Sequence, residues 1–85
     1  MWEKGNSKEA IMTQDLSNQI EYLVCCIGSF AERFSITNAS AYKYLDKFGG
    51  LDFLIKHYDL EHTFSIDDAT DDITRICNRN GGYLQ

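Results

Sequence analysis

The apolar residues between positions 16 and 34 recur with the period of an α-helix. Consecutive members are 4, 3, 1, 3, 3, 1 and 3 positions apart, which places them on one stripe over about five turns. The stripe consists of Leu16, Ile20, Leu23, Val24, Ile27, Phe30, Ala31 and Phe34. The opposite face carries charged residues such as Glu21 and Arg33. The pattern predicts a long amphipathic core helix, with Leu23, Ile27 and Phe30 in the middle of its buried side.

Three further segments carry helical signals, and no segment shows the alternation that is typical of a strand. A second helix follows a cap at Thr37 or Asn38 and ends at Gly49-Gly50, because glycine is favoured just past a helix end. A short third helix comes directly after the glycines. A fourth begins at an N-cap Ser65 and ends near Arg79. We predict an all-α fold, a compact small bundle of about four helices with a short third helix.

The chain divides into one domain and two short flanks. Weak periodicity over residues 1–14 predicts a flexible or partly helical lead-in, residues 15–82 form a single helical domain, and residues 83–85 are a tail. With 85 residues, the chain is near the lower limit for a self-sufficient hydrophobic core. A domain of this size has no room for a deep catalytic cleft, and no nucleophile or phosphate-loop motif is present. We therefore predict that it is not an enzyme.

Charge and cysteine content limit the partners and the location. The net charge of −5 argues against binding to nucleic-acid phosphates or to an anionic membrane, because both need clustered Lys and Arg. Three cysteines, two of them adjacent, suit a disulfide scaffold poorly. No signal-peptide pattern opens the chain, and its longest apolar run, residues 23–27, is far below the ~20 residues of a membrane span. We predict a cytoplasmic protein without membrane association.

Polar side chains crowd the segment between the third and fourth helices. We predict that this segment is a structural corner, in which His62 or Thr63 satisfies open backbone groups at a helix end and Tyr58 packs inward. The alternative is a metal site, since His57, Asp59, Glu61 and His62 are metal ligands by residue type. Their spacing does not fit a helical His-x-x-x-His pair, and the sequence has no second ligand cluster, so we predict neither a metal nor a cofactor. The corner residues are Tyr58, Asp59, His62 and Thr63.

Four aspartates within six positions form an acidic ridge on the fourth helix, and we name Asp67, Asp68, Asp71 and Asp72 the ridge. Steps of three and four place them along one side of the helix. The first two complement the helix dipole, but this effect fades after the first turn. The ridge is therefore either a solvated face or a docking patch for the basic surface of a protein partner. We predict that it contributes to partner binding.

A DNA-binding function is the alternative. The second helix, the two glycines and the third helix imitate a helix-turn-helix. The third helix offers only Asp52, Lys56 and His57 as polar side chains, which is little positive charge for a DNA groove. Nucleic acid is thus the less favoured partner, and a small DNA-binding regulator of its own operon is the second hypothesis.

Several short motifs, in order, resemble a small bacterial family catalogued as domain of unknown function 3791. The most specific of them is the run Tyr-Asp-Leu-Glu-His-Thr at 58–63. The others are Ile-Glu-Tyr-Leu-Val at 20–24, a Gly-x-Leu-x-x-Leu break that ends at Leu54, and Asp-Asp-Ile at 71–73 before a Gly-Gly end. The resemblance covers residues 16–82. Gly28 departs from it, since members more often carry an acidic residue there, and this departure would loosen the first helix locally.

The resemblance implies a short helical protein of gut and related bacteria. Genes of this family often lie beside others, some of which resemble ADP-ribosyltransferase toxins. No activity is established for the family, so the resemblance assigns no catalytic residue. By analogy with this neighbourhood, we predict a non-enzymatic protein-interaction module, antitoxin-like or immunity-like, whose partner is a protein encoded nearby, such as an ADP-ribosyltransferase-like toxin.

Overall fold

A computed structural model of the chain describes the backbone of residues 2–84 and the side chains of residues 16–84. This part of the chain is all-α and contains no strand. Its helices are α1 (Trp2–Phe34), α2 (Asn38–Lys47), α3 (Gly50–Lys56), α4 (Tyr58–Glu61) and α5 (Ile66–Arg79). The all-α prediction is confirmed, but the structure has five helices instead of about four. The additional one is α4, a single turn within the segment that we expected to be a corner.

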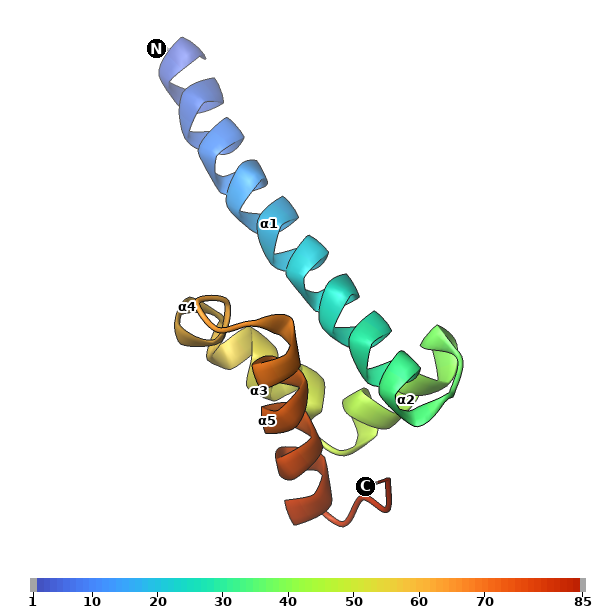
Figure 1. Cartoon of the computed structure of the whole chain (residues 1–85). Coiled ribbons are helices and arrows are strands. Elements are labelled where there is room, and N and C mark those ends of the chain that lie inside the picture. The colour runs from blue at the N-terminus through green and yellow to red at the C-terminus, as the bar shows by residue number, and fades with distance from the viewer. Residues whose placement is uncertain (1, 85) are drawn as a thin grey trace.

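The other helices gather around the C-terminal half of α1, and its N-terminal half extends beyond them (Figure 1). Both α2 and α5 pack on α1, and α3 packs on α5 and α2. The molecule therefore measures 53 × 23 × 22 Å along its principal axes. Within residues 1–14, which we expected to be a flexible or partly helical lead-in, the backbone is helical from Trp2 onward. The side chain of Trp2 lies outside the described residues.

Side-chain caps and glycines set the helix boundaries. Thr37 caps α2 by accepting a hydrogen bond from the Ser40 N–H at 3.0 Å, and Ser65 caps α5 by accepting one from the Asp68 N–H at 3.0 Å. Gly49 has a φ of 84°, a left-handed conformation that glycine adopts without steric cost. These features confirm the predicted starts of the second and last long helices and the predicted break between α2 and α3.

The core lies where α1, α2, α3 and α5 meet. Phe30 is fully buried, and its ring centroid lies 4.8 Å from that of Phe34 and 5.6 Å from that of Tyr44. This confirms the prediction for Phe30, whereas Leu23 and Ile27 are only half-buried against the core. The other fully buried side chains of large or medium size are Leu45, Leu54, Ile73, Thr70, Cys26 and Cys77.

The expectation that the whole α1 stripe is core is wrong for its N-terminal part. Leu16, Ile20 and Val24 are 58%, 52% and 61% exposed. The physical reason is the length of α1: the shorter helices cover only its C-terminal half, and the apolar pattern continues past the point where they end. This leaves an apolar line on the projecting half of α1, which we call the α1 line (Leu16, Ile20 and Val24).

The residues after α5 pack back on the bundle. The Leu84 N–H donates a hydrogen bond to the Tyr44 hydroxyl at 3.0 Å. A Cβ atom at Gly82 would lie 2.3 Å from that hydroxyl oxygen and 2.7 Å from the Cys77 carbonyl oxygen, so only glycine allows this close approach. The segment that we expected to be a tail is thus attached to α2 through Leu84, which is half-buried.

Candidate interaction surfaces

The predicted corner is built around the single turn of α4. The Tyr58 and His62 rings are stacked with centroids 4.6 Å apart, and Tyr22 of α1 meets Tyr58 edge-on at 5.4 Å. The His62 Nδ1 atom lies 2.6 Å from the Tyr58 carbonyl oxygen, and the Thr63 hydroxyl donates to the Leu60 carbonyl oxygen at 2.6 Å. The same two carbonyl oxygens also accept backbone N–H bonds, from His62 at 3.0 Å and from Thr63 at 3.1 Å, so the side chains of His62 and Thr63 add a second contact to each. A structural role of the corner stays a prediction. Asp59 is exposed.

Replacing His62 by Ala should lower the free energy of unfolding by about 0.5–1.5 kcal/mol. The variant loses the stacking of the His62 ring on Tyr58 and the contact of the His62 Nδ1 atom with the Tyr58 carbonyl oxygen, although that oxygen keeps its bond from the backbone N–H of residue 62. Urea denaturation measures this change. The exposed neighbour in Asp59→Asn serves as the control, and its effect should stay within about 0.5 kcal/mol. Addition of zinc should leave the unfolding midpoint of the wild type unchanged. A zinc-dependent stabilisation that is lost in His62→Ala would contradict the structural role.

The ridge is partly neutralised by arginines of the same chain. Asp67, Asp68 and Asp71 are exposed, whereas Asp72 is half-buried. The Arg33 Nη1 atom forms an ion pair with the Asp71 Oδ1 atom at 2.6 Å, and Arg75 pairs with Asp72. The first pair joins α1 to α5 across 38 positions of sequence, so no local pattern could indicate it. Two of the four ridge carboxylates thus have basic partners before any other molecule binds.

A shallow pocket of about 330 Å³ lies along the ridge. We call it the ridge pocket, and its lining residues are Phe64, Asp68, Asp71, Asp72 and Arg75. Phe64 is 42% exposed and forms the aromatic part of the wall. The structure therefore brings three of the four predicted ridge residues to one concave site. Asp67 does not line it.

Beside Asp72 lies a buried carboxyl group, that of Glu61, which the sequence analysis considered only as a candidate metal ligand. Glu61 is only 3% exposed, and its Oε1 atom has no hydrogen-bond partner among the described residues. The same holds for the buried Tyr22 hydroxyl, which lies near the Cys26 thiol without a well-formed hydrogen bond to it. Glu61 stands among exposed polar residues in the sequence, and its neighbours Tyr22 of α1 and Asp72 of α5 are far from it along the chain.

The protonation of Glu61 follows from its burial. Loss of hydration raises the pKa of the Glu61 carboxyl group to about 7, a hydrogen bond with the neighbouring Asp72 carboxyl acts in the same direction, and the Arg75 cation opposes both. Burial also raises the pKa of the Tyr22 hydroxyl above its ordinary value. At neutral pH, a substantial fraction of the Glu61 carboxyl groups is therefore protonated.

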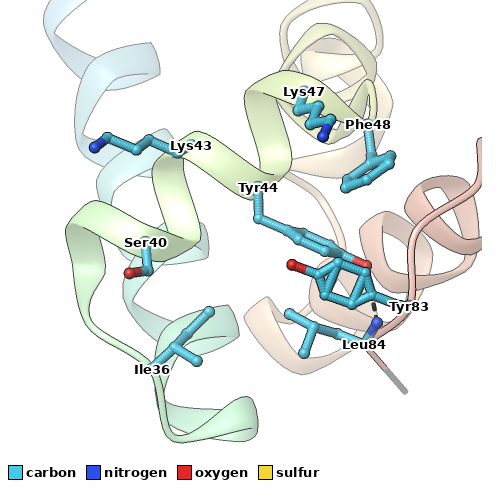
Figure 2. A pocket seen from close by; sticks show the side chains of 8 residues that line it. All are labelled: Ile36, Ser40, Lys43, Tyr44, Lys47, Phe48, Tyr83 and Leu84. Carbon is cyan, nitrogen blue, oxygen red and sulfur yellow. Dashed lines mark hydrogen bonds between the residues drawn. The ribbon is translucent and has the colours of Figure 1, made fainter.

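A second pocket, of about 400 Å³, lies between α2 and the segment after α5. Figure 2 shows the rings of Tyr44, Phe48 and Tyr83 gathered on one side of it, with Lys43 and Lys47 on the α2 ribbon above. The Tyr83 ring centroid lies 5.4 Å from that of Tyr44 and 6.2 Å from that of Phe48. These contacts hold the end of the chain against α2, so we interpret the pocket as a seam of the fold.

Two buried cysteines, Cys26 and Cys77, lie in the core outside these pockets. Burial raises the pKa of the Cys26 and Cys77 thiols to about 11, which leaves little reactive thiolate at neutral pH. Among residues 16–84, no group of three or more His, Cys, Asp and Glu side chains could hold a metal ion. In the described part of the chain, no helix is long and apolar enough to cross a membrane.

The fold and these surfaces define a class of protein: a small all-α domain with one long projecting helix, an exposed apolar line on that helix and an acidic pocket beside it. Residues 21–80 match the family described as protein of unknown function (DUF3791), and the chain belongs to that family. The match includes the Tyr-Asp-Leu-Glu-His-Thr run and all of α2 to α5. No curated protein and no solved structure matches the chain.

Proposed function

We propose that this protein is a non-enzymatic protein-binding module and that its partner docks on the α1 line. The observation that supports this most is the exposure of Leu16, Ile20 and Val24, each more than half accessible and four positions apart. That spacing places them in a row on one side of the helix. A row of large apolar side chains on a projecting helix is the arrangement by which amphipathic helices bind apolar grooves.

Burial of the three α1-line side chains can supply enough free energy for specific binding. Burying a Val, Leu or Ile side chain completely contributes about 1.5–3 kcal/mol, and about half of each α1-line side chain is still available for burial. The three together can therefore contribute roughly 2–4 kcal/mol to association. The half-buried Leu23 and Ile27 flank the row and widen its apolar area.

The partner that we propose is a protein encoded beside this one, such as an ADP-ribosyltransferase-like toxin, and the binding occurs in the cytoplasm. This chain would then be antitoxin-like or immunity-like. The net charge of −5 and the ridge add to the proposal that the partner presents basic residues around an apolar groove. The ridge residues Asp67 and Asp68, which are exposed, would meet those basic residues at the rim.

The test is co-purification with the neighbouring protein after co-expression. The double variant Ile20→Gln/Val24→Gln keeps helix-forming residues in an exposed part of α1 and removes the apolar line. We expect it to fold normally and to bind about 10–100 times more weakly, since roughly 1–3 kcal/mol of apolar burial is lost. The matched control is Glu21→Gln, which changes an exposed residue on another side of the same helix and should bind like the wild type.

Equal affinities of wild type and double variant would show that the α1 line is not part of the interface.

The alternative function, a DNA-binding regulator of its own operon, has weaker support. The helix that would enter the groove, α3, has seven residues, and Asp52 and Lys56 are the charged side chains that it exposes. Binding of the chain to its own promoter that falls steeply with salt, without binding to the neighbouring protein, would favour this alternative.

A further inference from the structure

We propose that the pocket of about 400 Å³ between α2 and the segment after α5 binds a small carboxylate with an aromatic body. We call it the seam pocket, because the contacts that join the end of the chain to α2 also form its wall (Figure 2). A cavity of this size is within the range of small-molecule sites, which are mostly apolar and carry a few polar groups. No residue of the α1 line is part of its wall, so the inference does not depend on partner binding.

The aromatic wall of the seam pocket is held in place by the fold. Tyr44 is buried, and its hydroxyl accepts a hydrogen bond from the Leu84 N–H at 3.0 Å. Gly82 allows the end of the chain to come this close, since a side chain there would clash with that hydroxyl. Tyr83 packs edge-on against Tyr44 and Phe48 and is still 72% exposed. Tyr83 can therefore cover an aromatic group in the pocket, because aromatic rings attract one another at centroid distances of about 4.5–7 Å.

Two lysines give the seam pocket a positive charge in an acidic chain. The chain has 13 Asp and Glu against 8 Lys and Arg, yet the pocket is lined by Lys43 and Lys47 and by no Asp or Glu. Both lysines are exposed, and neither forms an ion pair within residues 16–84. They are four positions apart on α2, and the Lys47 Nζ atom lies 5.3 Å from the centroid of the Phe48 ring. Because lysine side chains are flexible, the two ammonium groups can bind one anion at the edge of the aromatic wall.

The position of the lysines favours a carboxylate over a phosphate. Lys47 lies in the last turn of α2, where the helix dipole is negative. Phosphate groups are typically bound at the opposite end of a helix, by its free backbone N–H groups. The negative end of α2 opposes a doubly charged phosphate more than a singly charged carboxylate. The ligand class is therefore an aromatic carboxylic acid in its ionised form.

The experiment uses the full chain and phenylpropionate, which combines a phenyl ring with one carboxylate. It is titrated into isotopically labelled protein at neutral pH and constant ionic strength, and the backbone amide shifts are recorded by NMR. We expect saturable shifts at Lys47, Phe48 and Tyr83, with a dissociation constant of about 1–10 mM for a molecule of this size. Phenylpropionamide has the same body without the charge and should bind about three to ten times more weakly. Phenyl phosphate, which is similar in size, should also bind more weakly than phenylpropionate.

Three variants locate the ligand. Lys43→Gln/Lys47→Gln should weaken phenylpropionate binding about three- to tenfold and leave the affinity for phenylpropionamide unchanged, because only the charged probe interacts with the ammonium groups. Tyr83→Ala removes the exposed ring and should weaken the binding of both probes. The control Lys56→Gln removes a positive charge from an exposed position on α3 outside the pocket, and it should bind both probes like the wild type.

Four results would contradict the inference. The absence of saturable shifts with phenylpropionate would overturn the site itself. Equal affinities for phenylpropionate and phenylpropionamide would overturn the role of the two lysines. A loss of affinity in Lys56→Gln as large as that in the double variant would show that the overall charge of the chain, and not the pocket, attracts the anion. Tighter binding of phenyl phosphate than of phenylpropionate would overturn the assignment of a carboxylate.

Discussion

Phe30→Ala is expected to lower the free energy of unfolding by about 3–5 kcal/mol, the cost of truncating a large and fully buried aromatic side chain. Phe30 has no exposed surface, and its ring packs against Phe34 on α1 and Tyr44 on α2. Its removal would leave a cavity at the junction of α1 and α2. Because small domains are stable by only ~5–15 kcal/mol, a large fraction of the variant should be unfolded at moderate temperature. Urea and thermal denaturation followed by circular dichroism measure the change.

Val24→Ala is the matched control for Phe30→Ala. It truncates another apolar side chain of the same helix, but one that is 61% exposed. Its effect on stability should stay within about 0.5 kcal/mol, as for other exposed sites. If Val24→Ala destabilises the protein as much as Phe30→Ala, the boundary between the buried and the projecting halves of α1 is placed wrongly.

The helices could be predicted from the sequence because their signals are local. The apolar period of α1, the Ser65 cap and the Gly49-Gly50 break each depend on residues a few positions apart. Periodicity indicates which side of a helix is apolar, but it does not indicate where the covering helices end. The burial of Phe30 and the exposure of Ile20 on the same stripe therefore could not be separated without the structure.

The candidate site was predictable only in part, for the same reason. The density of aspartates on α5 predicted the ridge, and the residue types of the corner predicted a structural role for His62 and Thr63. The pairing of Arg33 with Asp71 and the burial of Glu61 depend on contacts between α1, α4 and α5, which are far apart in the sequence. The single turn of α4 also could not be predicted from the sequence, because four residues are too few for a periodic signal.

The burial of Glu61 predicts how stability should depend on pH. Its pKa is raised from 4.5 to about 7 in the folded state, mainly by burial and further by Asp72. Between these two values the folded state holds a proton that the unfolded state has released. Stability should therefore decrease as the pH rises from about 4.5 to about 7 and change no further above that. The contribution of this group is on the order of 1–3 kcal/mol over the window.

Glu61→Gln isolates this contribution. Glutamine is neutral at every pH and can still donate a hydrogen bond to Asp72, so the variant resembles the protonated wild type. Near pH 4.5 the two proteins should have similar stability. At pH 8 the variant should be more stable by about 1–3 kcal/mol, because it buries no ionised carboxylate. The measurement is the difference in free energy of unfolding between variant and wild type, from urea titrations at pH values between 4.5 and 8.5.

The control for the pH experiment is Glu21→Gln, which removes an exposed carboxylate of α1. Its stability difference from the wild type should be small and nearly independent of pH, since an exposed carboxylate has a similar environment in the folded and unfolded chains. Because each variant is compared with the wild type at the same pH, the titration of the other acidic groups cancels from the difference in free energy of unfolding. A Glu61→Gln difference that is flat across this range would show that Glu61 ionises at its ordinary pKa, and that water reaches the space between α4 and α5.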